Sequence, residues 1–276
     1  MTLGVRNTIL RLGLIVSIGL LGAYGYWAYQ ILSGDMQLSA LSVAAEQSWL
    51  LLRWETQPNQ LLWAIGGLGF LGLFVPTTVS VLTRFFRKVA APEMFFFVVF
   101  VLALSFDLFK LVHPLRHAVD FARAYSVSAT RVVLFGHILG VFALFASSLY
   151  VAGVTYQKTG TALGFAALIA FALVYSIPVD SLTLLPNFVY QAGEERSLQI
   201  VVLVLQGLSV LNCAYGAFLS QDRGYLVLCF GLLLVIVGRQ LLYYLASPTS
   251  IALGALLLLG GTALFVGKSR NMYLWL

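Results

Sequence analysis

Residues 93–117 read EMFFFVVFVLALSFDLFKLVHPLRH, an apolar run that ends among charged and imidazole side chains. The run is long enough to cross the bilayer core of about 30 Å as a helix. At about 100° per residue, Asp107, Lys110, His113 and His117 fall within an arc of about 120° on that helix. Ionisable groups inside a membrane need partners and indicate a functional site by default. This stretch therefore predicts a membrane span that contributes a polar stripe to such a site.

The rest of the chain has the composition of a membrane protein. Of its 276 residues, 61% are hydrophobic and only 9% are charged, whereas soluble domains contain about 25% charged residues. We therefore expect one integral membrane domain that covers residues 1–276 and has the lipid bilayer as its surroundings. The net charge of +6 is typical of basic cytoplasmic loops. It does not indicate a nucleic-acid partner, because no basic cluster is interleaved with exposed aromatic residues.

Recurring apolar runs predict an all-α polytopic bundle of about eight transmembrane helices. The expected spans cover about residues 9–32, 61–83, 93–114, 131–154, 161–180, 198–219, 225–246 and 250–267. Residues 9–32 are interpreted as an uncleaved anchor helix and residues 61–267 as a seven-helix block. The outer segment 33–60 is expected to be a short helix on the membrane surface or an ordinary connector. Residues 115–130 are expected to hold a second short surface helix.

The distribution of basic residues predicts the orientation of the bundle, because such residues collect on cytoplasmic loops. With the N-terminus inside, nine basic residues lie on the cytoplasmic side: Arg6, Arg11, Arg84, Arg87, Lys88, Lys158, Arg223, Lys268 and Arg270. Five lie on the outer side: Arg53, Arg116, Arg123, Arg131 and Arg196. We therefore expect both termini to be cytoplasmic, in a plasma membrane that we take to be the bacterial inner membrane.

The depth of the ionisable residues predicts where a polar pocket lies. Asp107 and Arg239 each lie roughly 21 Å from the cytoplasmic ends of their spans at 1.5 Å per residue, and His137 lies about 9 Å from the outer end of its own. These depths coincide in a core of about 30 Å. The predicted ligand-binding residues, in the outer half of the bundle, are Asp107, Lys110, His113, His137, Asp180, Arg239, Gln240 and Tyr243.

Electrostatics predicts how these charges pair. We expect Asp107 to pair with Arg239 or Lys110 and Asp180 to balance the other cation, because a lone charge in lipid costs several kcal/mol. Lys110 is also compatible with a side chain that extends to the outer interface. A purely structural ion-pair network is as compatible with the pattern as a ligand site.

Two further patterns predict helix faces inside the bundle. Gln199, Gln206, Ser209 and Cys213 share one face of the span 198–219, so this face is expected to point inward. Gly136 and Gly140 form a GxxxG pair, which predicts close packing with a neighbouring helix. Cys213 and Cys229 lie in apolar runs and do not indicate a disulfide framework.

The sequence contains weak signals for metal or catalytic chemistry. His113 and His117 are four residues apart and, with His137, are compatible with a metal or haem site. No HExxH motif or cysteine ligand supports that site, so we expect neither a metal nor another cofactor. None of the membrane serines lies in a GxSxG motif, and no phosphate-binding loop appears, so no catalytic residue is assigned.

These observations favour a non-enzymatic sensor-like or receptor-like protein, or a subunit of a complex. It would bind a small ligand and signal through a membrane or cytoplasmic partner protein. The alternative is a small-solute transporter or channel subunit, which kinks at Pro76 and Pro178 would allow, although no internal repeat is visible. A second alternative is an intramembrane enzyme that acts on lipid with Asp107, His137 and Asp180. No residue motif identifies a family.

Overall fold

The computed structural model describes residues 3–33, 43, 46–49, 52–55, 59–86, 91–118, 122–154, 158–193, 195–220, 223–245 and 247–274. Within these residues, eight helices are long and apolar enough to cross a membrane. This confirms the multi-pass helix bundle that the apolar runs predict.

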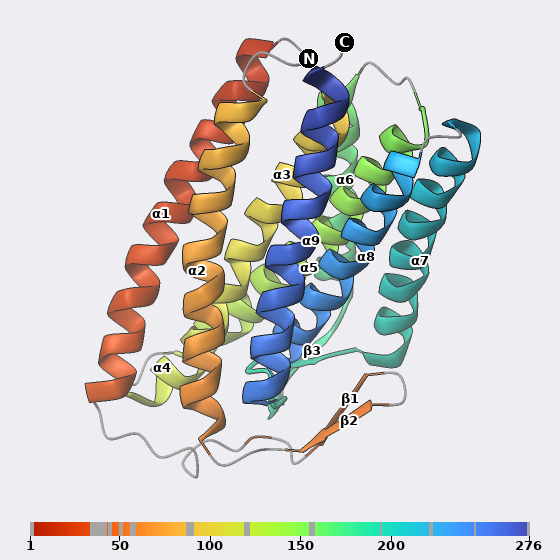
Figure 1. Cartoon of the computed structure of the whole chain (residues 1–276). Coiled ribbons are helices and arrows are strands. Elements are labelled where there is room, and N and C mark those ends of the chain that lie inside the picture. The colour runs from red at the N-terminus through yellow and green to blue at the C-terminus, as the bar shows by residue number, and fades with distance from the viewer. Residues whose placement is uncertain are drawn as a thin grey trace.

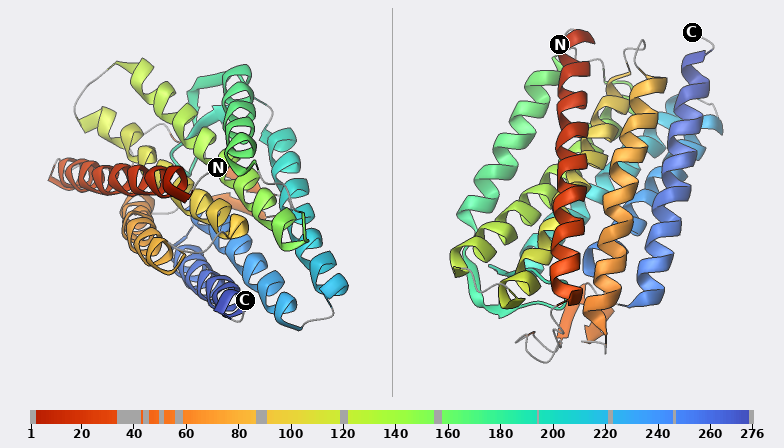
Figure 2. Two further views of the ribbon diagram at one scale, coloured as in Figure 1. Left: turned by 90° about the horizontal axis from the view of Figure 1, so that it is seen from above. Right: turned by 90° about the vertical axis from the view of Figure 1, so that its left-hand side faces the viewer.

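The helices run up and down in one bundle (Figure 1). They are α1 (Leu3–Ser33), α2 (Gln60–Phe85), α3 (Pro92–Ala103), the 3₁₀ helix η2 (Leu104–Leu111), α4 (Val112–Ala118), α5 (Arg123–Val151), α6 (Thr159–Ser176), α7 (Glu195–Ser220), α8 (Arg223–Tyr244) and α9 (Pro248–Leu274). Both chain termini lie at one end, which we call the termini end, where α1 begins and α2 and α9 finish. The opposite end, with α4 and all the strands, is called the hairpin end (Figures 1 and 2).

Two short antiparallel hairpins lie at the hairpin end. β1 (Glu46–Trp49) pairs with β2 (Leu52–Glu55) in the register Glu46 to Glu55. The surface helix that the segment 33–60 was expected to form is therefore wrong for these residues. The two strands pair the backbone N–H and C=O groups with each other, so no helix is needed to satisfy them. Most of the remaining segment lies outside the described residues. β3 (Val179–Leu184) pairs with β4 (Tyr190–Ala192).

The second hairpin arises because α6 ends early. A helix to residue 180 was expected, but α6 ends at Ser176 and Ile177 has an extended backbone with φ −80° and ψ 122°. Pro178 explains this, because the residue before a proline avoids the helical region. The chain therefore enters β3 at Val179, and Asp180 lies on a strand instead of on a helix.

The segment between η2 and α5 also differs from its predicted form. Instead of a separate surface helix over 115–130, α4 continues to Ala118 and α5 begins at Arg123. Helix α5 thus starts eight residues earlier than the apolar run, since a helix can extend beyond the hydrocarbon core into the headgroup region. His137 lies 14 residues into α5 but only six residues after the start of the apolar run, so the longer helix leaves its estimated depth of about 9 Å unchanged.

Helix α1 belongs to the bundle and is not a detached anchor. The Tyr24 hydroxyl donates a 2.6 Å hydrogen bond to the Ile65 carbonyl of α2. A Cβ added at Gly72 of α2 would lie 2.9 Å from a methyl of Leu21. The chain is therefore better described as an eight-helix bundle than as seven helices with an anchor.

The α3–η2 segment is the centre of the bundle. In its most apolar window 83% of the residues are buried, against 11% for α1 and for α6, which face outward. Its last eight residues form a 3₁₀ helix, a conformation that rarely continues beyond three or four residues and often marks a functional segment. Because a 3₁₀ helix has three residues per turn, Asp107 and Lys110 lie in one column along η2.

Glycines let backbones meet at two interfaces. A Cβ at Gly136 of α5 would lie 2.5 Å from the Phe106 Cβ of η2, which confirms the predicted close-packing face. A Cβ at Gly238 of α8 would lie 2.6 Å from the Leu258 nitrogen of α9, and one at Gly261 would lie 2.7 Å from the Gly231 carbonyl oxygen. Helices α8 and α9 therefore touch backbone to backbone along their length.

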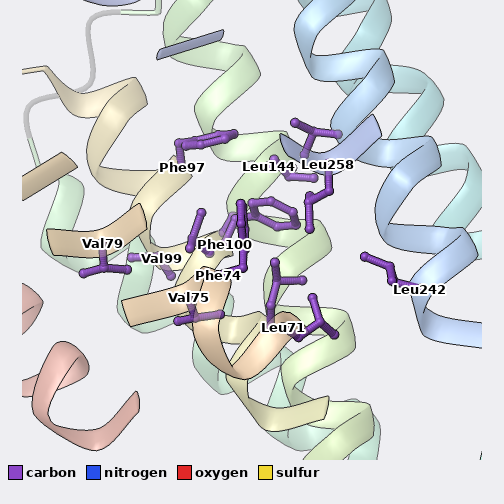
Figure 3. Close-up of a cluster of buried hydrophobic side chains, with 14 of the residues drawn as sticks. Leu71, Phe74, Val75, Val79, Phe97, Val99, Phe100, Leu144, Leu242 and Leu258 are labelled. Carbon is purple, nitrogen blue, oxygen red and sulfur yellow. The ribbon is translucent and has the colours of Figure 1, made fainter. Parts of the chain in front are cut away.

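An apolar core fills the bundle between α2, α3, α5 and α9 (Figure 3). The Phe97 and Phe265 rings stack with their centroids 4.6 Å apart, and Phe100, Leu144 and Leu258 are at most 1% exposed beside them. These side chains fill the bundle on the side of the polar residues described next that faces the termini end.

Candidate functional site

A buried ion pair lies on η2. The Lys110 ammonium is 3.5 Å from a carboxylate oxygen of Asp107, three residues earlier in the same column. The two side chains are almost inaccessible, with Lys110 fully buried. This pairing is one of the two predicted from the sequence, and it excludes the alternative in which Lys110 extends to the interface.

Lys110 also caps helix α8. Its ammonium donates a 2.8 Å hydrogen bond to the Tyr243 carbonyl, in the last turn of α8, and lies 4.0 Å from the centroid of the Tyr243 ring. The last carbonyls of a helix have no partner within it and carry partial negative charge. Lys110 is therefore held by a carboxylate, a helix C-terminus and an aromatic face.

Arg239 of α8 supplies a second buried cation. Its guanidinium donates a 2.9 Å hydrogen bond to the His137 carbonyl of α5 and lies 5.8 Å from the Phe100 ring centroid. Gly140 makes this approach possible, since a Cβ there would lie 3.2 Å from the guanidinium. The Nε and Nη1 groups of Arg239 are buried without a hydrogen-bond partner among the described residues.

Asp180 does not balance this cation. It is exposed on β3, where its carboxylate accepts hydrogen bonds from the Leu182 N–H at 2.9 Å and the Thr183 hydroxyl at 2.8 Å. These bonds lower the pKa of Asp180 below its ordinary value. The expectation that Asp180 neutralises a buried cation is therefore wrong, because Pro178 turns the chain away from α6 before Asp180.

The buried cluster of Asp107, Lys110 and Arg239 consequently carries a net charge of about +1. Asp107 attracts both cations electrostatically. The C-terminus of α8 adds a partial negative charge equivalent to about half an electron. Part of the positive charge stays uncompensated by ionised side chains among the described residues, which makes the surrounding potential favourable for an electron-rich group.

A cavity of about 40 Å³ lies beside this cluster, between α5, α7, α8 and the β3–β4 hairpin. Its lining includes His137, Asn187, Gln199, Gln240, Tyr243 and Tyr244. A water needs roughly 10–15 Å³ on this scale, so the cavity holds about three water-sized groups. Three of the predicted site residues, His137, Gln240 and Tyr243, therefore line one cavity.

Polar groups at the cavity have unused hydrogen-bonding capacity. The Gln240 amide donates a 3.0 Å hydrogen bond to the Gln206 carbonyl oxygen of α7, which leaves the Gln240 oxygen and the Gln206 nitrogen without partners among the described residues. The His137 Nδ1 atom is likewise buried and unpartnered within this part of the chain. Such groups are costly when buried alone, so the cavity suits a polar occupant.

Tyr243 joins the cavity to the ion cluster. Its ring lies 4.0 Å from the His137 ring at an angle of 40°, and the same residue receives the Lys110 hydrogen bond and cation–π contact. A group that enters the cavity thus touches a residue that also holds Lys110. These contacts connect Lys110 of η2 through Tyr243 of α8 to His137 of α5.

The β3–β4 turn closes the cavity at the hairpin end. The Gln60 amide of α2 donates a 2.7 Å hydrogen bond to the Pro186 carbonyl, and the Asn187 carboxamide accepts one from the Val189 N–H at 3.3 Å. Phe188 has φ 59°, a left-handed conformation that is unfavourable for a residue with a side chain, yet it is 1% exposed. Packing therefore holds this turn in place.

His113 contributes to the hairpin contact instead of lining the cavity. Its Nε2 atom lies 3.1 Å from the Thr130 hydroxyl of α5, and its ring packs edge-on against Tyr190 of β4 at 4.7 Å. The Tyr190 N–H donates to the same hydroxyl at 3.3 Å. His113 thus supports Tyr190, which lines the cavity.

No cluster of three His, Cys, Asp or Glu side chains that could hold a metal ion occurs among the described residues. The side chain of His117 lies outside them. His113 and His137 serve different contacts, with Thr130 and with Tyr243 respectively.

Sequence reasoning missed several lining residues of the cavity. Asn187 and Tyr190 belong to the hairpin, in the interval between the spans 161–180 and 198–219, for which the apolar runs predict no element. The inward face of α7 was predicted, and Gln206, Ser209 and Cys213 are indeed buried. The signal that could have found the hairpin is Pro178, which prevents α6 from continuing.

Comparisons of the chain with protein-family models, with curated proteins and with solved structures give no match.

Proposed function

We propose that this protein is a receptor-like or sensor-like membrane component that binds a small polar ligand in the cavity beside Tyr243. The observation that carries the proposal is the cavity itself, which is lined by His137 and Gln240 next to a net positive charge. The His137 Nδ1 atom and the Gln240 carboxamide oxygen are buried without a partner among the described residues, and Gln206 accepts the hydrogen bond of the Gln240 amide. Such a site favours a small anion or a neutral ligand rich in acceptors over a cation.

Ligand entry would be coupled to the bundle through Tyr243. A ligand that displaces this ring changes the distance between Lys110 and the end of α8, because the same residue receives the Lys110 contacts. The coupling is reciprocal, so any partner that shifts α8 would change ligand affinity by the same factor. The output of the protein would then pass to a partner protein in the membrane or at the termini end.

A receptor explains the geometry better than a transporter. A conduit needs polar groups through the full thickness of the bundle, whereas the stacked rings of Phe97 and Phe265 and the buried Phe100 fill the part towards the termini end. Figure 3 shows Phe97 and Phe100 among other buried apolar side chains. An intramembrane enzyme receives little support, because Asp180 is separated from the other two residues in its proposed role.

Thermal unfolding of the purified protein with three small probes tests the proposal. Acetate, formamide and methylammonium are small probes with four, three and two non-hydrogen atoms, and they carry negative, no and positive charge respectively. We expect acetate to stabilise the protein most and methylammonium least, with about 2.7 kcal/mol of stabilisation when the probe is 100-fold above its Kd. Gln240→Leu should abolish the acetate effect, since Gln240 lines the cavity.

Asn212→Leu is the matched control. Asn212 is also an amide between helices, donates to Ser148 at 3.2 Å and is remote from the cavity lining. It should keep the full acetate response. The proposal fails if no probe shifts the melting temperature, or if Gln240→Leu responds to acetate as strongly as the unmodified protein does. Acetate flux through proteoliposomes at the rate of a transporter would favour the transporter interpretation.

A further inference from the structure

A second cavity lies at the termini end, far from the candidate ligand site. It has a volume of about 160 Å³ and is lined by Asn7, Leu10 and Arg11 of α1 and by Thr83 and Arg84 of α2. Leu10 is buried at its base, and the two arginines are exposed at its rim. The cavity is therefore a cleft between two membrane helices with an apolar floor and a basic opening.

The two arginines have no counterion among the residues that the structure describes. Neither Arg11 nor Arg84 forms an ion pair or hydrogen bond with another residue in the described ranges, where the one salt bridge is that of Lys110. Two guanidinium groups that face one cleft repel each other, and an anion between them would remove that repulsion. Guanidinium groups also match the geometry of phosphate oxygens closely.

Neighbouring residues fix the cleft and add positive charge. Arg6 donates a 2.9 Å hydrogen bond to the Phe86 carbonyl, which ties the start of α1 to the end of α2. Arg270 of α9 stacks over the Phe85 ring with its guanidinium carbon 4.5 Å from the ring centroid. The cleft between α1 and α2 is thus fixed by a contact between these two helices, and Arg270 of α9 adds a further cation near the end of α2.

Basic and acidic residues of the whole chain are also distributed unevenly between the two ends of the bundle, with the excess of positive charge at the termini end. Counted along the sequence, the nine basic residues assigned above to the cytoplasmic side belong to the termini end, together with only two acids, Glu93 and Asp222. The hairpin end has five basic residues and seven acids, which are Asp35, Glu46, Glu55, Asp120, Asp180, Glu194 and Glu195. The loops and helix ends at the termini end therefore attract anionic groups more strongly than those at the hairpin end.

The depth of the cleft matches the headgroup layer. Helices α1 and α2 have 31 and 26 residues, so at 1.5 Å per residue they are about 46 and 39 Å long. A core of about 30 Å centred on them ends near residues 8 and 82, at the level of Asn7 and Thr83. A basic cleft between membrane helices at this level is the type of place where anionic lipid headgroups bind.

We infer that the cleft between Arg11 and Arg84 binds the phosphate of an anionic phospholipid, whose acyl chains lie along α1 and α2. Arg11 and Arg84 contact the phosphate oxygens, Asn7 and Thr83 offer further hydrogen bonds, and Leu10 contacts the glycerol and acyl region. This site is independent of the proposed ligand cavity, with which it shares no residue.

Native mass spectrometry of the full chain in a neutral detergent tests this assignment, with phosphatidylglycerol and phosphatidylcholine of the same acyl chains as probes. We expect one phosphatidylglycerol to bind more tightly than the rest. Arg11→Gln/Arg84→Gln should weaken that first binding about 30-fold, because each basic residue near a membrane surface contributes about a fivefold factor. Arg11→Lys/Arg84→Lys should retain binding to within a few-fold, since the charge is kept.

Arg123→Gln/Arg196→Gln is the matched control, because it removes the same charge from exposed positions at the hairpin end. This control variant should bind the first phosphatidylglycerol molecule as tightly as the unmodified protein does. Equal binding of phosphatidylcholine, or unchanged phosphatidylglycerol binding by Arg11→Gln/Arg84→Gln, would overturn the inference. Inorganic phosphate separates the two sources of the anion: if millimolar phosphate displaces the lipid completely and binds alone as tightly, the occupant is a free anion and the lipid assignment is wrong.

Discussion

Neutralising Asp107 should destabilise the protein far more than neutralising its partner Lys110. Asp107→Asn leaves Lys110 and Arg239 buried without an ionised acid beside them, a net charge of about +2 in the cluster. Lys110→Met leaves Asp107 with Arg239, which it already attracts, and a net charge of about zero. The two substitutions remove the same ion pair, but only Asp107→Asn adds excess positive charge, whereas Lys110→Met also removes the contacts with Tyr243.

The magnitude follows from the geometry. Two unit charges 3.5 Å apart interact with about 5 kcal/mol at an effective dielectric constant of about 20, and breaking a buried pair costs about 3–5 kcal/mol. We therefore expect Asp107→Asn to lower the free energy of unfolding by about 3–5 kcal/mol. Lys110→Met should lower it by about 2 kcal/mol, mainly through the lost hydrogen bond to the Tyr243 carbonyl. The double variant should be more stable than Asp107→Asn alone by about 2 kcal/mol.

Unfolding in detergent micelles, followed by circular dichroism, measures these differences. Ser105→Ala is the control on the same segment, because its hydroxyl donates to the Leu102 carbonyl of its own turn, and its cost should stay near 1 kcal/mol or below. Equal destabilisation by Asp107→Asn and Lys110→Met, or a double variant whose loss is the sum of both, would refute the charge argument.

Three further outcomes are expected. Gly136→Ala should cost about 1–3 kcal/mol by overpacking against η2, whereas Gly207→Ala, with nothing within 4 Å of the new methyl, should stabilise α7 by up to about 1 kcal/mol; melting curves check both signs. Hydrogen bonds lower the pKa of Asp180, so the ionised Asp180 carboxylate should stabilise the β3 turn at neutral pH and lose this effect only as the pH falls below about 3.9. Amide exchange in β3 measures this effect, and an acceleration of exchange that begins near pH 6 as the pH is lowered would contradict it. Gln206→Leu or Gln240→Leu alone should cost about 1–3 kcal/mol in the same melts, and the two together less than the sum, because no buried amide is then left unpaired.

The helices of the bundle were predictable because hydrocarbon imposes a minimum apolar length that each run must meet. The ends of the helices were not predictable, because a helix can continue beyond that length into the headgroup layer. Helix α5, for example, begins at Arg123, whereas its apolar run begins at residue 131. The early end of α6 has a local signal in Pro178, which apolar length alone overlooks.

The ion cluster was predictable from depth, because charges in lipid must meet partners at their own level. Asp107, Lys110 and Arg239 satisfy that rule, whereas Asp180 lies outside the membrane helices, where water removes the requirement. The cavity wall of Asn187 and Tyr190 was not predictable in this way. Short strands within a loop carry too few residues for a clear alternation of polar and apolar side chains.

The glycines of α8 and α9 have a mechanical consequence. Gly231 and Gly238 are seven residues apart, as are Gly254 and Gly261, and each lies against backbone of the other helix. Neither helix can slide along the other without collision of main-chain atoms, so we expect α8 and α9 to move together as one rigid unit. Since α9 extends 27 residues, about 40 Å, we expect a tilt of α8 beside the cavity to tilt α9 as well, over a length greater than that of the bilayer core.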